Sequence, residues 1–300
     1  VPDNIGILFF FSNFILDKWL ILNLAKPILI NQNVISDKHL SKQWQELNYL
    51  SLPDFNSAIE EYRTFVKYLG KTGIKYFPFV DSTTIDSIYC RDASIVTDFG
   101  MIICNMGKSG RINEPRSQKQ VFKINNIPIL GEIKSPGTLE GGDVSWLDEK
   151  TLAVGHTYRT NKEGIVQLKE LLEPKGIVVI VAELPHYKGK QDVFHLMSIL
   201  SPIDKDLAVV YSPFMSIKFR NTLIERGFKF VEVPDEEFES MGCNVLAIAP
   251  RECIMVDGNP ITKQRLEAAD CKVKVYKGEE ISVKGGGGPT CLTRPLLRSF

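Results

Sequence analysis

The chain lacks an excess of charge of either sign. Its 300 residues include 36 Lys and Arg against 36 Asp and Glu, so the formal net charge is zero. A protein that binds nucleic acid through its phosphates needs a basic surface, and an even charge balance gives no support for one. We therefore expect no nucleic-acid partner.

The sequence also lacks the motifs of nucleotide and metal binding. No glycine-rich phosphate loop of the GxGxxG or GxxxxGK[ST] type follows an apolar run. The six cysteines are scattered without CxxC pairs, and the four histidines show no HxH or HExxH spacing. We expect no metal and no organic cofactor, and we interpret the cysteines as reduced thiols of a cytoplasmic protein.

An uninterrupted hydrophobic run long enough for a membrane span is missing as well. Residues 5–16 are almost wholly apolar, but Asp17 and Lys18 separate them from the next apolar run. A spanning helix needs about 20 apolar residues, and a signal peptide needs a basic start that residues 1–4 do not provide. We expect buried strands or a misassigned start here and no membrane partner; a membrane or export segment is the alternative.

What the chain does contain is an alternation of short apolar runs with helical patterns. Residues 54–72 place apolar side chains at helical spacing, with Asn56 and Ser57 as plausible caps. Further helical patterns cover residues 162–172, 214–226 and 262–269. Strand-like runs bounded by Gly, Pro or Asp cover residues 94–96, 101–104, 151–154, 177–181, 208–211, 229–233, 245–249, 252–256 and 272–276.

These elements recur as strand pairs separated by one helix, about every 50 to 60 residues. Such a recurrence predicts an α/β protein built from a repeated ββα-type unit in a ring or stack, rather than one continuous Rossmann sheet. No low-complexity segment or Pro/Ser-rich linker divides the chain, so we expect residues 1–300 to form a single domain.

The strongest local signal lies in residues 284–295, KGGGGPTCLTRP. Four consecutive glycines are tolerated where a backbone turns sharply or approaches a ligand closely, and here they lead to Cys291. A cysteine on such a loop can be accessible to solvent and can draw on backbone N–H groups that lower its pKa, as a nucleophile requires. The alternative is a flexible tail that carries an inert buried thiol.

A cysteine nucleophile needs a partner base, and the chain offers four histidines: His39, His156, His186 and His195. His195 lies in the apolar stretch VFHLM, where an imidazole would be held in one orientation. A hydrogen-bonded core histidine would have the same surroundings. His195 is nevertheless the candidate acid/base.

One cluster of acids surrounds paired glycines. In GTLEGGD, residues 137–143, a tight bend presents Glu140 and Asp143, and Arg159 follows in YRTN. An arginine there could bind a carboxylate through two parallel hydrogen bonds. The cluster could also be a turn with ordinary surface charges.

A second cluster precedes it. In DSIYCRD, residues 86–92, Asp86 and Asp92 enclose an apolar-rich run, and Arg111 and Glu114 follow in RINEP. This cluster too is weak when taken alone.

Taken together, and in this order, the motifs DSIYCRD, RxxEP, TLEGGDV, YRTNKEG, FHLMS and GGGGPTCLTRP resemble a known superfamily. It is the guanidino-modifying superfamily of arginine deiminases, dimethylarginine dimethylaminohydrolases and glycine amidinotransferases. The resemblance covers residues 54–298, while residues 1–50 match poorly. It implies the pentein fold, a five-fold pseudosymmetric α/β propeller of ββαβ units, which agrees with the recurrence.

The resemblance also implies residue roles. Cys291 would be the nucleophile, His195 the acid/base, and Glu140 the acid that orients His195 and contacts the guanidinium. The remaining matched residues would bind the substrate: Asp92 at the guanidinium nitrogens, Asp86 at the amino-acid end, and Arg111 and Arg159 at the α-carboxylate. Asp143 is taken as structural. Attack by the thiolate and protonation of the leaving amine by His195 would give a covalent amidino-thioether.

One departure from the pattern concerns Met197, two residues beyond His195. Deiminases and amidinotransferases carry His-x-Asp there, whereas dimethylargininases carry His-Leu-Lys and also lack the acid. A less charged pocket could admit a substituted guanidine. The CRD motif with Arg91 and the cysteine loop resemble deiminases more closely, so the subfamily stays open.

The sequence therefore predicts a cysteine-dependent hydrolase of a small guanidino substrate, arginine or N-methylated arginine, that releases citrulline and ammonia or an alkylamine. An amidinotransferase, which passes the amidino group to an acceptor amine, shares the same covalent intermediate. A catalytically silent binding protein of this fold is the third possibility. A homo-oligomer is compatible with the sequence.

Overall fold

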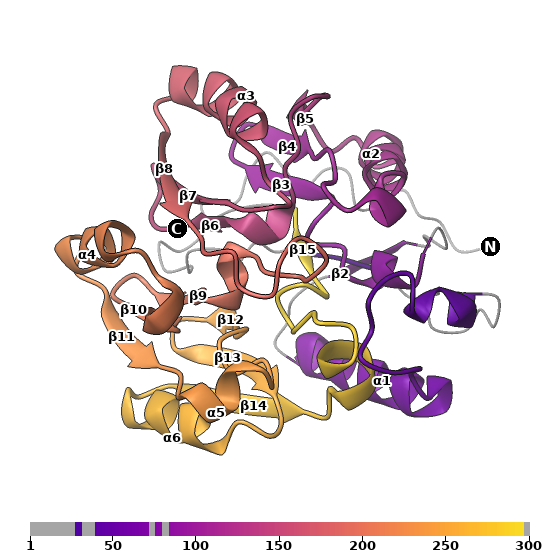
Figure 1. Cartoon of the computed structure of the whole chain (residues 1–300), viewed down its shortest axis with the longest axis vertical. Helices are drawn as coiled ribbons and strands as arrows, with labels where there is room; N and C mark the ends of the chain where they lie inside the picture. The colour runs from indigo at the N-terminus through magenta and orange to yellow at the C-terminus, as the bar shows by residue number, and fades with distance from the viewer. Residues whose placement is uncertain (1–27, 32–39, 72–75, 80–83, 297–300) are drawn as a thin grey trace.

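The described part of the chain, residues 28–31, 40–71, 76–79 and 84–296 of a computed structural model, contains five three-stranded sheets (Figure 1). The apolar run at residues 5–16 lies outside these residues. The sequence predicts buried strands or a misassigned start there, with a membrane or export segment as the alternative. Within the described residues no helix combines the length and apolar character that crossing a membrane requires.

All five sheets share one pairing pattern, in which the middle strand is antiparallel to one neighbour and parallel to the other. Four of them are built from consecutive strands: β3 (Ser94–Thr97), β4 (Gly100–Ile103) and β5 (Ile129–Glu132); β6 (Val144–Trp146), β7 (Thr151–His156) and β8 (Val178–Glu183); β9 (Leu200–Asp204), β10 (Leu207–Val210) and β11 (Lys229–Glu232); β12 (Leu246–Ala249), β13 (Glu252–Val256) and β14 (Lys272–Tyr276).

A helix connects the second and third strands of each of these sheets, because parallel strands need a crossover. The four helices are α2 (Glu114–Ile124), α3 (Lys162–Leu172), α4 (Ile217–Glu225) and α6 (Pro260–Ala268). Figure 1 shows these helices toward the outside and the sheets around the centre of the molecule. The mixed α/β class and the repeated unit predicted from the sequence are thus confirmed.

The fifth sheet combines segments far apart in the sequence. The strand β1 (Ile28–Asn31) pairs antiparallel with β15 (Arg294–Pro295) and parallel with β2 (Tyr76–Phe79). Helix α1 (Phe55–Lys71) provides the crossover between β1 and β2. The loop that carries Cys291 therefore leads directly into a strand of this sheet.

Several short helices complete the fold. They are η2 (Leu40–Trp44), η3 (Ile85–Ile88), η4 (Ser109–Arg111), η5 (Gly141–Asp143), η6 (Glu173–Lys175), η7 (Leu196–Ser198), η8 (Ser212–Phe214), α5 (Asp235–Phe238) and the π-helix η9 (Glu279–Val283). Four of them, η3, η4, η5 and η7, contain or adjoin candidate site residues predicted from the sequence.

The predicted helices were confirmed, with corrections at their starts. The α1 caps proposed at Asn56 and Ser57 are wrong, because the Asp54 carboxylate accepts the backbone N–H of Ser57 at 2.8 Å and both residues lie inside the helix. Helix α4 begins three residues later than predicted, since Ser216 caps it by accepting the N–H of Phe219. Helix α6 begins two residues earlier, at Pro260.

The elements that the pattern missed have weak or interrupted apolar periodicity. Helix α2 buries Phe122 and Gln118 on a face of an otherwise charged sequence, and β9 contains Pro202. Strand β6 has only three residues, and β5 contains Gly131 and is half-buried throughout. Pairing with neighbouring strands decides these elements, and a short window of sequence does not reveal such pairing.

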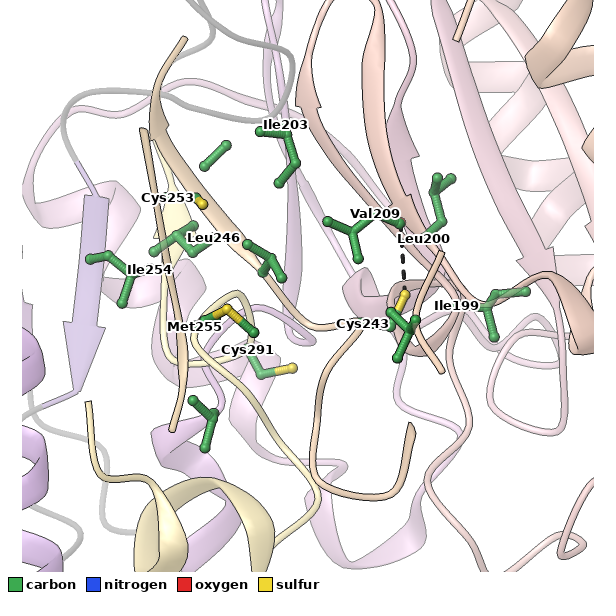
Figure 2. Packing of buried hydrophobic residues seen from close by; sticks show 14 of the residues in the cluster. Ile199, Leu200, Ile203, Val209, Cys243, Leu246, Cys253, Ile254, Met255 and Cys291 are labelled. Carbon is green, nitrogen blue, oxygen red and sulfur yellow. Dashed lines mark hydrogen bonds between the residues drawn. The ribbon is translucent and has the colours of Figure 1, made fainter. Parts of the chain in front are cut away.

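The main hydrophobic core reaches the cysteine loop. Figure 2 shows Cys291 beside buried side chains of β9, β10, β12 and β13, among them Leu200, Val209, Leu246 and Met255. Burial of each large aliphatic side chain contributes about 1.5 to 3 kcal/mol relative to exposure. The loop is therefore anchored on the main hydrophobic core.

Helix α1 offers a test of this packing. Phe65 is fully buried and its ring centroid lies 5.2 Å from that of Tyr276 on β14. Phe65→Ala should lower the free energy of unfolding by about 3 to 5 kcal/mol, through lost burial and the cavity that remains. The measurement is chemical denaturation. The exposed neighbour Thr64 is the control, since Thr64→Ala should change stability by less than about 0.5 kcal/mol. Equal effects of the two substitutions would contradict the packing.

Candidate active site

His195 and Glu140 form a buried hydrogen-bonded pair. His195 Nε2 lies 2.8 Å from Glu140 Oε2, and Glu140 has no exposed surface. The other oxygen of Glu140 accepts the backbone N–H of Lys108 at 2.9 Å and lies 3.7 Å from Arg159 Nη1. The pair thus joins three segments that are far apart in the sequence.

The paired glycines after Glu140 allow this close approach. A Cβ on Gly142 would lie 2.4 Å from His195 Nδ1 and 2.7 Å from Asp92 Oδ1, and a Cβ on Gly141 would lie 2.2 Å from the carbonyl oxygen of Arg91. Real Cβ atoms do not approach other atoms so closely. The GG motif, interpreted from the sequence as a bend that presents carboxylates, is required because three backbone segments meet there.

Asp143 holds the histidine segment from the other side. Its Oδ1 accepts the backbone N–H of Leu196 at 3.0 Å, and its Oδ2 accepts the hydroxyl of Thr157 at 2.7 Å. Burial raises the pKa of Asp143 to about 6, against the lowering effect of the nearby His195. The carboxylate fixes the start of η7, where His195 is placed.

The environment makes His195 unusually basic. Burial by itself lowers the pKa of an imidazole, but the charges of Asp143 and Asp92 and the hydrogen bond to Glu140 outweigh burial and raise the pKa of His195 to about 9. Burial would raise the pKa of Glu140, yet its bond to His195 lowers that pKa to about 2. At neutral pH the pair is an imidazolium and a carboxylate.

Asp92 and Asp86 each keep one carboxylate oxygen free. Asp92 Oδ2 accepts a hydrogen bond from Arg111 Nη1 at 2.6 Å, and Asp86 Oδ2 accepts one from Lys108 Nζ at 2.6 Å. Asp92 Oδ1 and Asp86 Oδ1 are buried and have no hydrogen-bond partner, and the same holds for the donor Arg159 Nε. A buried polar atom without a partner costs about 1 to 3 kcal/mol, so these three atoms mark positions where a ligand can complete the bonding.

The Arg111 guanidinium is hydrogen-bonded to acidic side chains of its own chain. It donates to Glu114 at 2.8 Å, to Asp92 at 2.6 Å and to the carbonyl oxygens of Asp86 and Tyr89. Burial raises the pKa of Glu114 to about 7 in spite of this pairing. Arg111 therefore holds Asp92 and Glu114 in place in this structure, and its expected contact with an α-carboxylate stays a prediction.

Lys108 was not singled out by the sequence analysis. Its side chain is nearly buried and binds both Asp86 and the carbonyl oxygen of Leu47, at 2.6 and 2.7 Å. The available signal was a cation three residues before Arg111, in a segment already suspected of binding.

Cys291 lies on a packed loop. A Cβ on Gly285 or Gly287 would collide with the Tyr89 ring, and one on Gly288 would collide with Asn244. The thiol sulfur accepts a hydrogen bond from Asn244 Nδ2 at 3.5 Å. The flexible-tail alternative is therefore wrong. Asn244 was also missed, and no sequence motif marks it.

The expected lowering of the Cys291 pKa by backbone N–H groups is wrong for this state of the protein. The side chain is 6% exposed, and the backbone N–H of Cys291 donates to Gly288 at 3.0 Å. Burial raises the pKa of the thiol and Asp92 raises it further, while hydrogen bonds from Thr290 and Asn244 and the charge of Arg91 offset part of the rise. The thiol is protonated at neutral pH.

A cavity of about 110 Å³ contains the thiol and the imidazole, whereas the predicted substrate-binding residues Asp86, Asp92, Arg111 and Arg159 do not line it. It is lined by Cys291, His195, Met197, Asn244 and Asp192, and its wall includes the aromatic side chains Tyr187, Phe194 and Phe238. A larger hollow of about 960 Å³ between α1 and β14 has an acidic lining without Cys or His. We assign the smaller cavity as the candidate site because its lining, unlike that of the larger hollow, combines a thiol and an imidazole.

Asp92, Glu140 and His195 form the group of possible metal ligands in the described residues, with one atom of each within 4.8 Å of the others. Glu140 is already bonded to His195, and Asp92 to Arg111. An ion-pair network accounts for the grouping, and the absence of a resident metal stays an expectation.

Comparison with known sequences gives one family. The sequence model described as "N,N dimethylarginine dimethylhydrolase, eukaryotic" matches residues 25–298. The chain is 28% identical over 271 residues to an arginine deiminase of Listeria welshimeri, covering 77% of this chain and 66% of that protein. It is 26% identical over 313 residues to an arginine deiminase of Mycoplasma capricolum, covering 88% and 75%. It thus spans about two thirds to three quarters of the length of these relatives.

Comparison with solved structures gives the same fold. The dimethylarginine dimethylaminohydrolase of Pseudomonas aeruginosa in complex with citrulline aligns with a TM-score of 0.74 and 23% identity, over 90% of this chain and 98% of that one. The N-terminal domain of a cyanobacterial arginine dihydrolase, bound to product, aligns with a TM-score of 0.78 and 18% identity, over 91% and 98%. At these identities the similarity establishes the fold.

The basicity of His195 can be measured directly. We expect its imidazole to titrate near pH 9 in an NMR titration, with the signal assigned by its loss in His195→Gln. Glu140→Gln should lower that midpoint, because it removes a negative charge and a strong acceptor. Glu183→Gln is the matched control, since Glu183 pairs with the partly exposed His156 at 2.6 Å and should leave the His195 signal unchanged. A wild-type midpoint near the ordinary value of about 6.5 would refute the assignment.

Proposed function

This chain belongs to the eukaryotic N,N-dimethylarginine dimethylhydrolase family, and from that membership we propose that it is a cysteine-dependent hydrolase of arginine or N-methylated arginine. The family lies within the guanidino-modifying pentein superfamily, and its relatives are hydrolases that act on C–N bonds of linear amidines. We take the five sheet units as the blades of the five-fold propeller implied by the resemblance.

The observation that carries the proposal is the pattern of unpaired buried atoms. Two carboxylate oxygens, Asp92 Oδ1 and Asp86 Oδ1, need donors, and one guanidinium nitrogen, Arg159 Nε, needs an acceptor. An amino acid with a guanidino side chain supplies all three partners: a guanidinium for Asp92, an α-ammonium for Asp86 and an α-carboxylate for Arg159. Buried charges require such pairing.

The first half of the reaction would use the acids and the thiol together. A guanidinium bound at Asp92 neutralises the charge that raises the Cys291 pKa and adds a positive charge beside the sulfur, so the thiol proton can leave to solvent. The thiolate adds to the guanidinium carbon. The His195 imidazolium then donates its proton to the departing nitrogen, the C–N bond breaks, and a covalent amidino-thioether remains.

The second half would reverse the role of the imidazole. Neutral His195 takes a proton from a water molecule, whose oxygen adds to the carbon of the intermediate. The C–S bond then breaks, which returns the thiolate and releases citrulline. The sum is a guanidinium plus water giving citrulline plus ammonium or an alkylammonium ion, and Glu140 would stabilise the imidazolium at both ends of the cycle.

The amidinotransferase alternative is not favoured. The relatives and structures to which the chain is similar are named as deiminases, a dihydrolase and dimethylaminohydrolases.

The decisive experiment is incubation of the full chain with arginine, N,N-dimethylarginine and agmatine, with and without glycine. We expect citrulline from the two amino acids, and little reaction with agmatine because it leaves Arg159 Nε unpaired. Cys291→Ser should abolish turnover while the fold is retained, whereas Cys271→Ser, outside the cavity, should keep wild-type activity. Ornithine produced only with glycine would establish the transferase instead, and no product from any substrate would leave a silent binding protein.

Met197 should decide between the two amino-acid substrates. It is buried in the wall of the cavity that contains Cys291 and His195, where its thioether suits an N-methyl group better than a charged N–H. Met197→Asp adds a charged contact and removes apolar surface, each worth about 1 to 3 kcal/mol. We expect it to shift the ratio of kcat/KM toward arginine by about tenfold or more. Met197→Leu, which keeps the wall apolar, should preserve the ratio; an unchanged ratio in Met197→Asp would show that this residue does not contact the guanidinium.

A further inference from the structure

Arg91 contacts the cysteine loop on both sides of Cys291. Its backbone N–H donates to the carbonyl oxygen of Cys291 at 3.1 Å, and its Nε donates to that of Thr290 at 2.8 Å. Its Nη2 donates to the hydroxyl of Thr293 at 3.2 Å. The side chain is 3% exposed, so these bonds form in a dry environment. One residue from a distant segment thus holds the backbone at Thr290 and Cys291 and the side chain of Thr293.

The charge of Arg91 has no fixed counter-ion. Arg111 is paired with Asp92 and Glu114 at 2.6 and 2.8 Å, whereas Arg91 forms no ion pair with any residue in the described ranges. Burial lowers the pKa of Arg91, but only to about 10, so the guanidinium is still charged at neutral pH. A buried cation without an anion is costly, and proteins retain such a group where an anion forms during function.

We propose that Arg91 is a positioning residue for Cys291, whose guanidinium holds the cysteine loop and supplies the buried positive charge that the thiolate faces when it forms. This inference rests on the proposed function, in which Cys291 is the nucleophile. The thiolate becomes the missing counter-ion, and the cost of the unpaired cation is relieved as the sulfur ionises.

The other groups around the sulfur do not provide this charge. Asp92, Tyr89 and Tyr276 interact with Cys291 as acids and disfavour its ionised form, while Thr290 and Asn244 are neutral donors. His195 lines the same cavity but is bonded to Glu140. The remaining charged side chains of the cavity are Asp192, Lys188, Glu239 and Lys284, and two of these are paired with each other at its wall, Lys188 with Glu239.

A purely structural role for Arg91 predicts different behaviour from an electrostatic one. Arg91→Gln keeps a hydrogen-bond donor for Thr290 but removes the charge. Arg91→Lys keeps the charge but loses the planar fork that reaches both threonines. Thr293→Val removes one acceptor of Arg91 and leaves the charge in place, so it is the matched control for loop geometry.

The experiment measures the rate at which iodoacetamide alkylates Cys291 in the full chain as a function of pH, with the site identified by mass spectrometry and by its loss in Cys291→Ser. We expect the midpoint of the pH profile to rise by one unit or more in Arg91→Gln. It should stay within about 0.3 units of wild type in Arg91→Lys and Thr293→Val, although kcat falls in Arg91→Lys. One pH unit corresponds to a tenfold change in the ionisation constant.

Each outcome decides the matter. An unchanged midpoint in folded Arg91→Gln, or an equal rise in Arg91→Gln and Arg91→Lys, would overturn the inference. Arg91 would then have a purely structural role, holding the loop through hydrogen bonds alone. If Arg91→Gln does not fold, Arg91→Lys still decides, because a rise of one unit or more with the charge retained contradicts the proposal. Failure of the proposed function is recognised separately, because alkylation of Cys291 in wild type would then leave activity unaffected.

Discussion

Everything in the candidate site depends on burying charges of both signs in one water-poor place. Asp92 is held by Arg111, Asp86 by Lys108, and Glu140 by His195, all with little or no exposed surface. Removing one partner of such a pair typically costs about 3 to 5 kcal/mol, because the other charge is left buried. The network is therefore rigid. The GGD and GGGG motifs place glycines where a Cβ would collide with neighbouring atoms of the site.

The same burial explains the state of the reactive groups. A thiol with a raised pKa and an imidazole with a raised pKa are both protonated when the cavity is empty. In the empty cavity Cys291 is thus in its thiol form. A thiol resists oxidation better than a thiolate, so the arrangement protects the sulfur.

The sequence predicted most of the fold because its period was clear. Short apolar runs with one helix between them imply the repeated unit, and α1 and α3 followed from helical spacing alone. Strand β6 and helix α2 escaped because their apolar signal is short or one-sided, and pairing across the sheet decides them. In the candidate site, the order of motifs along the chain singled out His195, Glu140 and Asp92, and the structure brings these side chains together. Lys108, Asn244 and the raised Cys291 pKa depend on segments that meet only in three dimensions, which no local motif records.

The sheet that joins β15 to β1 and β2 has a consequence for biosynthesis. Its strands lie at widely separated places in the chain, and closing so long a loop is slow and entropically costly. Cys291 stands three residues before β15, so the sulfur reaches its partners only after the ribosome has delivered nearly all the intervening sequence. Nascent or truncated chains would carry the acids and the histidine without a placed thiol, and the candidate site would be complete only when the two distant segments have found each other.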